Sequence, residues 1–300
     1  MPSSLEYGRP VSTPNPISVQ GPNRVGVVLA DLDKINVKAL KYLVLHLNTL
    51  QKSVEFEFLA PQANDPLLAT LKPYAVVDRE ACRERLAEFQ QRMLAYGHAE
   101  QQAYNLSDPT QPENFVIISL ARFSDEHYGV KKDHVQVQAL GDWDREMAPP
   151  SILEFIIVLL MRQAISFAAP ALSKSTHLGT KGCLFDFTPE LSEARYKALQ
   201  SFMCANCRKR LQGSGSEQLV EDFSRASDLS WLGLPSDPHC PAGIVANLGY
   251  NLFLTKGIQP TFWENVHSVL RDEATKEAIK IVFALLLAFL LLRLGLKGAK

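Results

Sequence analysis

The sequence predicts an α/β fold in which a mixed β-sheet packs against helices, and three observations lead to this prediction. Residues 24–30 (RVGVVLA) form a short β-branched run that is typical of a strand. Over residues 36–50 leucines recur at helical spacing, and residues 53–59 (SVEFEFL) alternate as a half-buried strand does. A strand, a helix and a strand in this order begin an α/β layer structure.

The middle of the chain continues this alternation. We expect a short strand within residues 73–78, a charged amphipathic helix over 78–104, and two further strands over 114–121 and 134–139. Two prolines then open an apolar helix over residues 151–168, where proline is tolerated because the first N–H groups of a helix have no partner. This helix is apolar nearly all round, which predicts that it is the central buried helix.

Composition limits the possible partners. The chain has 300 residues, 46% of them hydrophobic, which is enough for a full core. The formal net charge is −1 and no Arg/Lys-rich tract is present, so a nucleic-acid partner is not expected. Residues 1–22 are rich in Ser, Pro and Asn and lack the features of a secretory signal, which indicates a flexible tail and an unexported body.

The C-terminal segment is strongly apolar. Residues 281–292 (IVFALLLAFLLL) are twelve apolar residues in a row, and the stretch 278–296 is nineteen residues long, which is in the range for a membrane-spanning helix. A buried core helix and a helix lying in the membrane interface are the alternatives, but an interfacial helix needs a charged face. We expect a single-pass tail anchor, with the main domain on the cytoplasmic side of a bacterial inner membrane.

A cluster of metal-ligating residue types follows the apolar helix. His177 and Cys183 are separated by five residues, and Cys204 and Cys207 form a Cys-x-x-Cys turn. Structural zinc sites combine four N or S ligands tetrahedrally, often as two short-range pairs. The second pair leads into a basic helical sequence, whose positive end favours thiolates. These four residues therefore predict one structural Zn²⁺ ion; a redox pair of cysteines, or ordinary buried residues, are the alternatives.

Other Cys, His and acidic residues near the cluster have predicted roles as well. Asp186 is placed to orient His177 through its second ring nitrogen. His239 and Cys240 are the residues best suited to replace a missing ligand, and Cys82, on the charged helix, is expected to pack in the core.

Two acidic groups elsewhere have both a functional and an ordinary interpretation. Asp125, Glu126 and His127 are a candidate catalytic or metal cluster, although polar loops of this kind are usually only solvated. Asp31 and Asp33 follow the first strand, where α/β sheets bind ligands, but they are more simply explained as caps of the next helix. The sequence contains no GxSxG elbow before a helix, no P-loop and no GxGxxG.

The order of elements and the cysteine segment resemble the archaemetzincin-type zinc metallopeptidases. Cys183-Leu-Phe-Asp-Phe and Cys204-Ala-Asn-Cys207-Arg-Lys-Arg-Leu match the second, structural zinc site of that family, with His177 in place of one cysteine. The family's catalytic motif HExxH is absent from this chain, and residues 161–166 of the long helix are MRQAIS. Glu154, in the same helix, has no neighbouring histidine. The resemblance therefore implies a scaffold that keeps a structural zinc and lacks the catalytic one.

Together these features predict an α/β metzincin-like domain with its zinc-stapled loop over residues 23–212, a helical connector over 213–277 and a transmembrane helix over 278–296. The expected function is that of a membrane-tethered, zinc-stabilised binding, regulatory or effector protein that has a protein partner and is not itself catalytic. The expected setting is a bacterial conflict or defence system. A divergent zinc-dependent hydrolase, or an effector that disrupts membranes through its C-terminal helix, are the alternatives.

Overall fold

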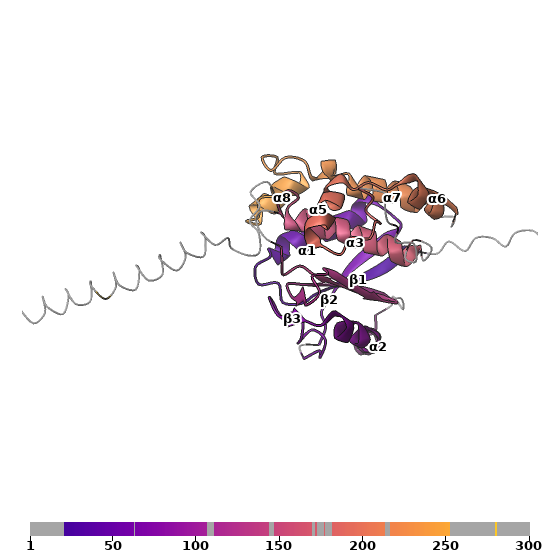
Figure 1. Cartoon of the computed structure of the whole chain (residues 1–300), viewed down its shortest axis with the longest axis vertical. Coiled ribbons are helices and arrows are strands. Elements are labelled where there is room, and N and C mark those ends of the chain that lie inside the picture. Colours follow the sequence, from indigo (N-terminus) through magenta and orange to yellow (C-terminus); the bar gives the residue numbers. More distant parts are fainter. Residues whose placement is uncertain are drawn as a thin grey trace, which may run out of the picture.

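The computed structural model has the chain arranged as an α/β layer structure (Figure 1). It describes residues 21–62, 64–106, 111–143, 147–169, 172, 177, 182–213, 217–252 and 280. The strands are β1 (Asn23–Leu29), β2 (Val54–Leu59), β3 (Val76–Val77), β4 (Asn114–Ser119), β5 (Arg122–Phe123), β6 (Gly129–Lys132) and β7 (Val135–Ala139). The helices are α1 (Val37–Leu50), α2 (Arg79–Tyr104), α3 (Ile152–Ala168), α5 (Leu191–Gln200), α6 (Ala205–Gly213), α7 (Glu217–Ser227), the 3₁₀ helix η2 (Leu229–Leu232) and α8 (Pro241–Asn247).

Five of these strands form a mixed sheet in the order β2-β1-β4-β7-β6. The strands β2, β1, β4 and β7 run parallel, and β6 pairs with β7 in the antiparallel direction at the edge. In the central register Val27 lies opposite Phe58 on one side and Val116 on the other. The short strands β3 and β5 form a separate parallel pair. The predicted mixed sheet with packed helices is confirmed.

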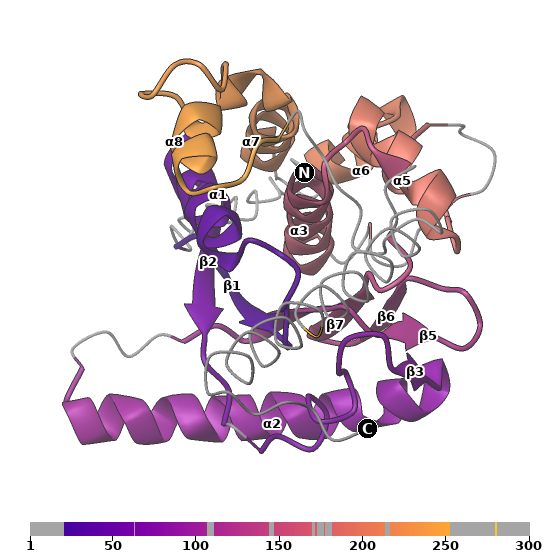
Figure 2. The ribbon, with the colours of Figure 1, turned by 90° about the vertical axis from the view of Figure 1, so that its left-hand side faces the viewer.

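The sheet is covered on both faces because its central strands present apolar side chains in both directions. Val27 and Val116 pack with α1 and α3 in one core, whereas Phe115 and Ile117 pack with α2 in a second core on the other face. Figure 2 shows α2 on one side of the sheet and α1 and α3 on the other. Cys82 on α2 belongs to the second core and is buried, so the packing role predicted for it is confirmed.

Helix α3 is the central buried helix, as its sequence predicts. Its N-terminus is fixed by a capping box in which the Ser151 hydroxyl accepts from the Glu154 N–H and the Glu154 carboxylate accepts from the Ser151 N–H. Glu154 therefore has a structural role at the helix end. The helix begins one residue after the predicted start at Ser151, and Pro149 and Pro150 come before its N-cap and not inside its first turn.

The helices α5 to α8 form an outer layer over α1 and α3 (Figure 1). Residues 217–252, which lie within the predicted connector 213–277, share the hydrophobic core of the sheet through Leu219, Phe223 and Val245. Asp222 on α7 accepts hydrogen bonds from the N–H groups of Lys52 (3.0 Å) and Ser53 (2.9 Å) at the start of β2. Burial of the Asp222 carboxyl raises its pKa. The hydrogen bonds from the Ser53 hydroxyl and from the two backbone N–H groups outweigh this effect and hold the pKa of Asp222 below its usual value.

Two short features differ from the sequence predictions. The strands β5 and β6 were not expected, because each is too short and too polar to show a clear alternation. Helix α1 is capped by Asn36, whose side chain accepts from the Ala39 N–H at 3.0 Å. The capping role predicted for Asp31 and Asp33 is therefore wrong, and both residues are exposed in the loop after β1.

Several predicted segments cannot be compared with the structure. Residues 1–20 of the predicted tail, 214–216 of the predicted joint and 278–296 of the predicted transmembrane helix, apart from Lys280, lie outside the described residues. Within the part of the chain that is described, no helix has the length and apolar character needed to cross a bilayer.

Candidate metal centre

The four predicted ligands, His177, Cys183, Cys204 and Cys207, come together in space. Their ligand atoms all lie within 4.8 Å of one another, and all three cysteines are buried. The five cysteines of the chain are free thiols, so no disulfide competes for these sulfurs. Across the described residues, no other group of His, Cys, Asp and Glu is close enough together to hold a metal ion.

Two short backbone bridges position the first pair of ligands. Cys183 lies beside Phe202 in a parallel bridge, in which the Leu184 N–H donates to the Phe202 carbonyl at 2.8 Å. His177 lies beside Asp186 in a second bridge. Because α5 returns the chain to Phe202, the residues that follow it are brought next to Cys183.

Gly182 allows the turn that precedes Cys183. Its φ angle is +97°, in the left-handed region that disfavours residues with a Cβ. A Cβ at this position would also lie 2.5 Å from Oε1 of Gln200, at the end of α5. The glycine therefore permits both the backbone conformation and the close approach of α5 to the cluster.

The second pair of ligands is fixed by the start of α6. Cys204 immediately precedes the helix and Cys207 lies in its first turn, where its N–H points to the Cys204 sulfur at 3.5 Å. The Cys204 N–H points in turn to the Cys183 sulfur, also at 3.5 Å. Backbone N–H groups thus face two of the sulfurs, an arrangement that stabilises thiolates.

The spacing of the ligand atoms fits a tetrahedral metal ion. With metal–sulfur bonds of about 2.3 Å and metal–nitrogen bonds of about 2.0 Å, tetrahedral angles place two sulfurs about 3.8 Å apart and a nitrogen and a sulfur about 3.5 Å apart. The sulfurs of Cys183 and Cys207 are 4.0 Å apart. His177 Nε2 lies 3.0 Å from the Cys207 sulfur and 3.5 Å from that of Cys204. These four residues can therefore hold a metal ion.

Asp186 lies where the sequence places it, behind the histidine. Its Oδ1 atom is 2.6 Å from Nδ1 of His177, and both side chains are largely buried. A carboxylate at this nitrogen leaves Nε2 free to face the three sulfurs. Lys197 Nζ, 4.0 Å from the other carboxylate oxygen, is the nearest described cation to Asp186.

The sulfurs of the cluster differ in how readily they ionise. The pKa of Cys183 is lowered to about 5 because the Cys207 thiol, and then the backbone N–H groups of Cys204 and Phe185, hydrogen-bond to its sulfur. The pKa of Cys207 is raised, because Cys207 retains the shared proton and is buried. Arg208 and Lys209, in the basic helical sequence that was expected to favour thiolates, are exposed, and the pKa of Cys183 is lowered by hydrogen bonding within the cluster.

The remaining candidate ligands lie apart from the cluster. Cys240 is the N-cap of α8, and its thiol donates to the carbonyls of Leu234 (2.8 Å) and Asp237 (3.1 Å). Neither His239 nor Cys240 is needed as a replacement, because the four predicted residues already supply four ligand atoms.

The acidic loop between β5 and β6 is held by an ion pair and is not a metal site. Asp125 accepts from Arg79 at 2.5 Å and lies 3.3 Å from His127 Nδ1, while Glu126 is exposed. His127, however, lines a cleft beside α3, together with Arg162, Gln163 and other residues. Of the features that the sequence singled out, His127 and residues 161–166 contribute to this cleft, but no sequence pattern predicted that they lie together.

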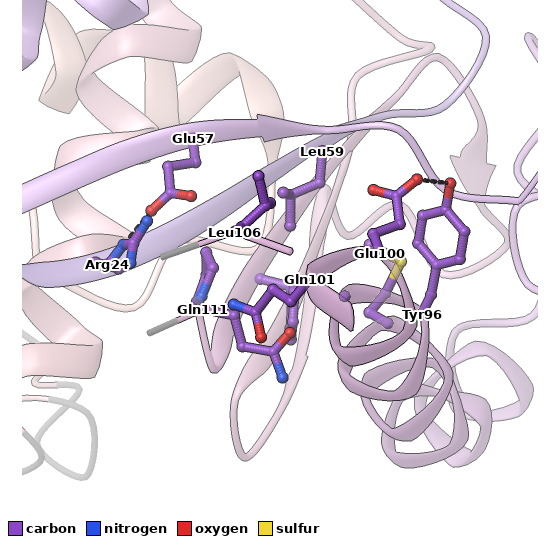
Figure 3. Close-up of a pocket in the computed structure, with 12 residues that line it drawn as sticks. Arg24, Glu57, Leu59, Tyr96, Glu100, Gln101, Leu106 and Gln111 are labelled. Atoms are coloured by element: carbon purple, nitrogen blue, oxygen red, sulfur yellow. Dashed lines mark hydrogen bonds and ion pairs between the residues drawn. The ribbon is translucent and has the colours of Figure 1, made fainter. Parts of the chain in front are cut away.

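A second cavity lies between α2 and the edge of the sheet (Figure 3). It has a volume of about 340 Å³, and most of its lining is apolar. Its described charged groups are already paired: Arg24 with Glu57, and the Tyr96 hydroxyl donating to Glu100 at 2.5 Å. This pairing gives it less capacity to bind a charged ligand.

Comparison with known proteins gives one distant similarity. No protein-family model matches the chain, and no curated protein is similar to it. Among solved structures, the crystal structure of archaemetzincin from Methanopyrus kandleri is similar, with 11% sequence identity and a TM-score of 0.37. The match covers 70% of this chain and 99% of that one. The chain is thus distantly similar to the family that its cysteine segment resembles, and nothing about activity follows from a similarity this low.

Proposed function

We propose that the protein is a zinc-stabilised binding protein whose metal ion holds the fold together and takes no part in catalysis. The observation that carries this proposal is the closed set of four ligand atoms, from His177, Cys183, Cys204 and Cys207, within 4.8 Å of one another. Structural zinc sites have four protein ligands, whereas catalytic ones have three and an open position for water or substrate.

The donor set supports zinc as the ion. Three thiolate sulfurs and one imidazole nitrogen in a tetrahedral arrangement suit Zn²⁺, a borderline-soft ion without a geometric preference of its own. The carboxylate of Asp186 beside His177 is the kind of outer ligand that orients a zinc-binding imidazole.

The position of the cluster supports a structural role. Cys183, Cys204 and Cys207 belong to the same hydrophobic core as α3, and they join the loop after α3 to the start of α6. Because Cys183 and Cys204 lie outside the helices and the sheet, a shared ion supplies a constraint that regular structure supplies elsewhere.

We further propose that a spanning helix over residues 278–296 holds the domain at the cytoplasmic face of a membrane, where it meets a protein partner. The support is the uninterrupted apolar run 281–292. Confinement to a surface raises the effective concentration of a domain, so that a weak partner interaction becomes effective.

Metal stoichiometry tests the first proposal. Native mass spectrometry of the full-length protein, purified without chelator, should show one zinc per chain. The variant Cys204→Ser should show no zinc, and its mass should be that of the metal-free chain. Absence of zinc in the unaltered protein contradicts the proposal. Two zinc ions per chain favour a divergent hydrolase instead.

Membrane fractionation tests the second proposal. The full-length protein should stay in the membrane fraction after extraction at high salt, and the double variant Leu286→Arg, Leu290→Arg should move to the soluble fraction, because each arginine costs about 3 kcal/mol at the centre of a spanning helix. An unaltered protein that is soluble and monomeric without detergent contradicts it.

A further inference from the structure

A cleft with a volume of about 400 Å³ lies beside α3, at the antiparallel edge of the sheet. It is bounded by β6, the edge strand of the sheet, by α3 and by the segment that follows Cys183. Its size is within the range of sites that bind small molecules. It is separate from the metal cluster, whose four ligand residues do not line it.

Two cations lie in this cleft without a carboxylate partner. Lys131 Nζ donates to the Ser166 hydroxyl at 3.0 Å and lies 4.2 Å from the centre of the Phe167 ring. Arg162 Nη1 donates to the Tyr128 hydroxyl at 2.9 Å. Within the described residues, no Asp or Glu is within ion-pair distance of either cation. Both positive charges are therefore balanced only by neutral groups.

The environment makes this arrangement unfavourable in the absence of a ligand. Lys131 and Arg162 are both only partly exposed, and burial together with the charge of Arg162 lowers the pKa of Lys131 to about 8. A cation that is desolvated next to another cation costs free energy unless an anion is present. Arg79, which also lines the cleft, is by contrast already paired with Asp125.

The rest of the cleft has the character of a ligand site. The buried amide of Gln163 and the buried hydroxyl of Thr188 also line it, which gives neutral hydrogen-bonding groups. Phe185 and Phe187 form an apolar side, and 51% of Phe187 is exposed although it lies beside this cleft. Cationic, neutral polar and aromatic groups thus converge on one cavity.

We propose that this cleft binds a small molecule through an oxyanion, a phosphate or carboxylate group held between Lys131 and Arg162, with an apolar part of the molecule against Phe185 and Phe187. Guanidinium and ammonium groups form strong charge-assisted hydrogen bonds to both kinds of oxyanion. The inference goes beyond the protein partner proposed above, and it requires neither the zinc ion nor the membrane helix.

Calorimetry on the full-length protein in detergent tests this inference with three probes of similar size. Phenyl phosphate and benzoate present the two oxyanions, and benzyl alcohol is the neutral control. Both anions, or one of them, should bind with an affinity that falls as salt is added, and the tighter one identifies the group for which the cleft is built. Lys131→Met and Arg162→Met should each weaken this binding at least tenfold.

Lys132→Met is the matched control, because it removes the same charge from the next position of β6, where the side chain points to the opposite face of the strand. It should leave binding unchanged. Three results overturn the inference: neither anion binds, benzyl alcohol binds as tightly as the anions, or Lys132→Met weakens binding as much as Lys131→Met.

A measurement on the unaltered protein guards against variants that fail to fold. At pH 8.5, binding of the oxyanion should be accompanied by proton uptake, seen as a difference in heat between buffers of different ionisation enthalpy, because an anion next to Lys131 raises its pKa. Binding without proton uptake contradicts the proposed contact with Lys131. Zinc content measured on the same samples separates the proposals: anion binding by a zinc-free protein overturns the structural zinc and leaves the anion site.

Discussion

Replacement of Cys207 is the perturbation that should reveal the metal most clearly. Its side chain is fully buried, its sulfur lies 3.0 Å from His177 Nε2 and 4.0 Å from the Cys183 sulfur, and it lies in the first turn of α6. Cys207→Ser changes only one atom of the side chain, but it replaces the soft sulfur with a hydroxyl oxygen and so removes one of four ligands. Three ligands remain, and the closed site is opened.

The expected loss of stability follows from mass action. An ion present at about 1,000 times its dissociation constant stabilises the folded state by about 4 kcal/mol. For a domain of this size, each kcal/mol shifts Tm by about 2 to 4 °C, so removal of the ion should lower Tm by about 8 to 16 °C. A chelator should cause this shift in the unaltered protein, and Cys207→Ser should begin near the lower Tm.

The assay is thermal unfolding with and without a chelator. Cys240→Ser is the matched control, because Cys240 lies outside the cluster and serine is a good N-cap for α8. This control should keep the full chelator-dependent shift, and Cys207→Ser should lose it. The reasoning is refuted if a chelator leaves the Tm of the unaltered protein unchanged, or if Cys207→Ser responds to it as the control does.

Three further predictions concern single side chains. Asp186→Asn should weaken zinc binding by about 10- to 100-fold in competition with a chromophoric chelator, because the carboxylate 2.6 Å from His177 Nδ1 is lost; unchanged affinity excludes this role. Asp222 has a lowered pKa in the folded protein, so its stabilisation is present above the pKa of the unfolded chain and is lost as pH falls through the folded value. Asp222→Asn should therefore cost about 1 to 3 kcal/mol at pH 7 in denaturant unfolding and much less near pH 3, and a cost that is independent of pH contradicts this account. The pKa of Lys131 is about 8, which is below the ordinary value of a lysine. The charge of Lys131 therefore destabilises the folded state below pH 8, and this destabilisation is lost as the pH rises toward 10. Lys131→Met should raise stability at pH 7 by about 1 kcal/mol or more, a gain that shrinks at pH 10, and a loss at pH 7 contradicts it.

The elements that the sequence predicts well are those with a repeating apolar pattern. The leucine spacing of α1 and the continuous apolar run of α3 fix their burial, and both helices lie where they were expected. The same holds for β1, β2, β4 and β7, whose β-branched residues are buried between helices. In each case one local pattern is enough to determine the packing.

Features that depend on tertiary contact were not predicted. The strand β6 contains two lysines in four residues and is recognisable only through its pairing with β7. Lys131 and Arg162 are 31 positions apart in the sequence, and only the fold places both in one cleft. Asn36 and not an aspartate caps α1, because the turn after β1 extends to residue 36 before the helix begins.

The candidate metal centre lies between these two cases. The Cys-x-x-Cys turn is a local pattern that favours a metal ligand pair, with a redox pair of cysteines as the alternative. The loose spacing of His177 and Cys183 does not, and their approach depends on Gly182 and on the bridge to Phe202. The sequence therefore suggests which four residues to consider, and the structure brings their ligand atoms together.

X-ray absorption spectroscopy at the zinc edge tests the central proposal most directly, since it counts the ligands of the ion in the purified protein. Closure of the site by His177, Cys183, Cys204 and Cys207 predicts three sulfurs at about 2.3 Å, one nitrogen at about 2.0 Å and no oxygen ligand. A spectrum with a water-like oxygen, or with fewer than three sulfurs, contradicts the closed structural site and places an open position on the metal.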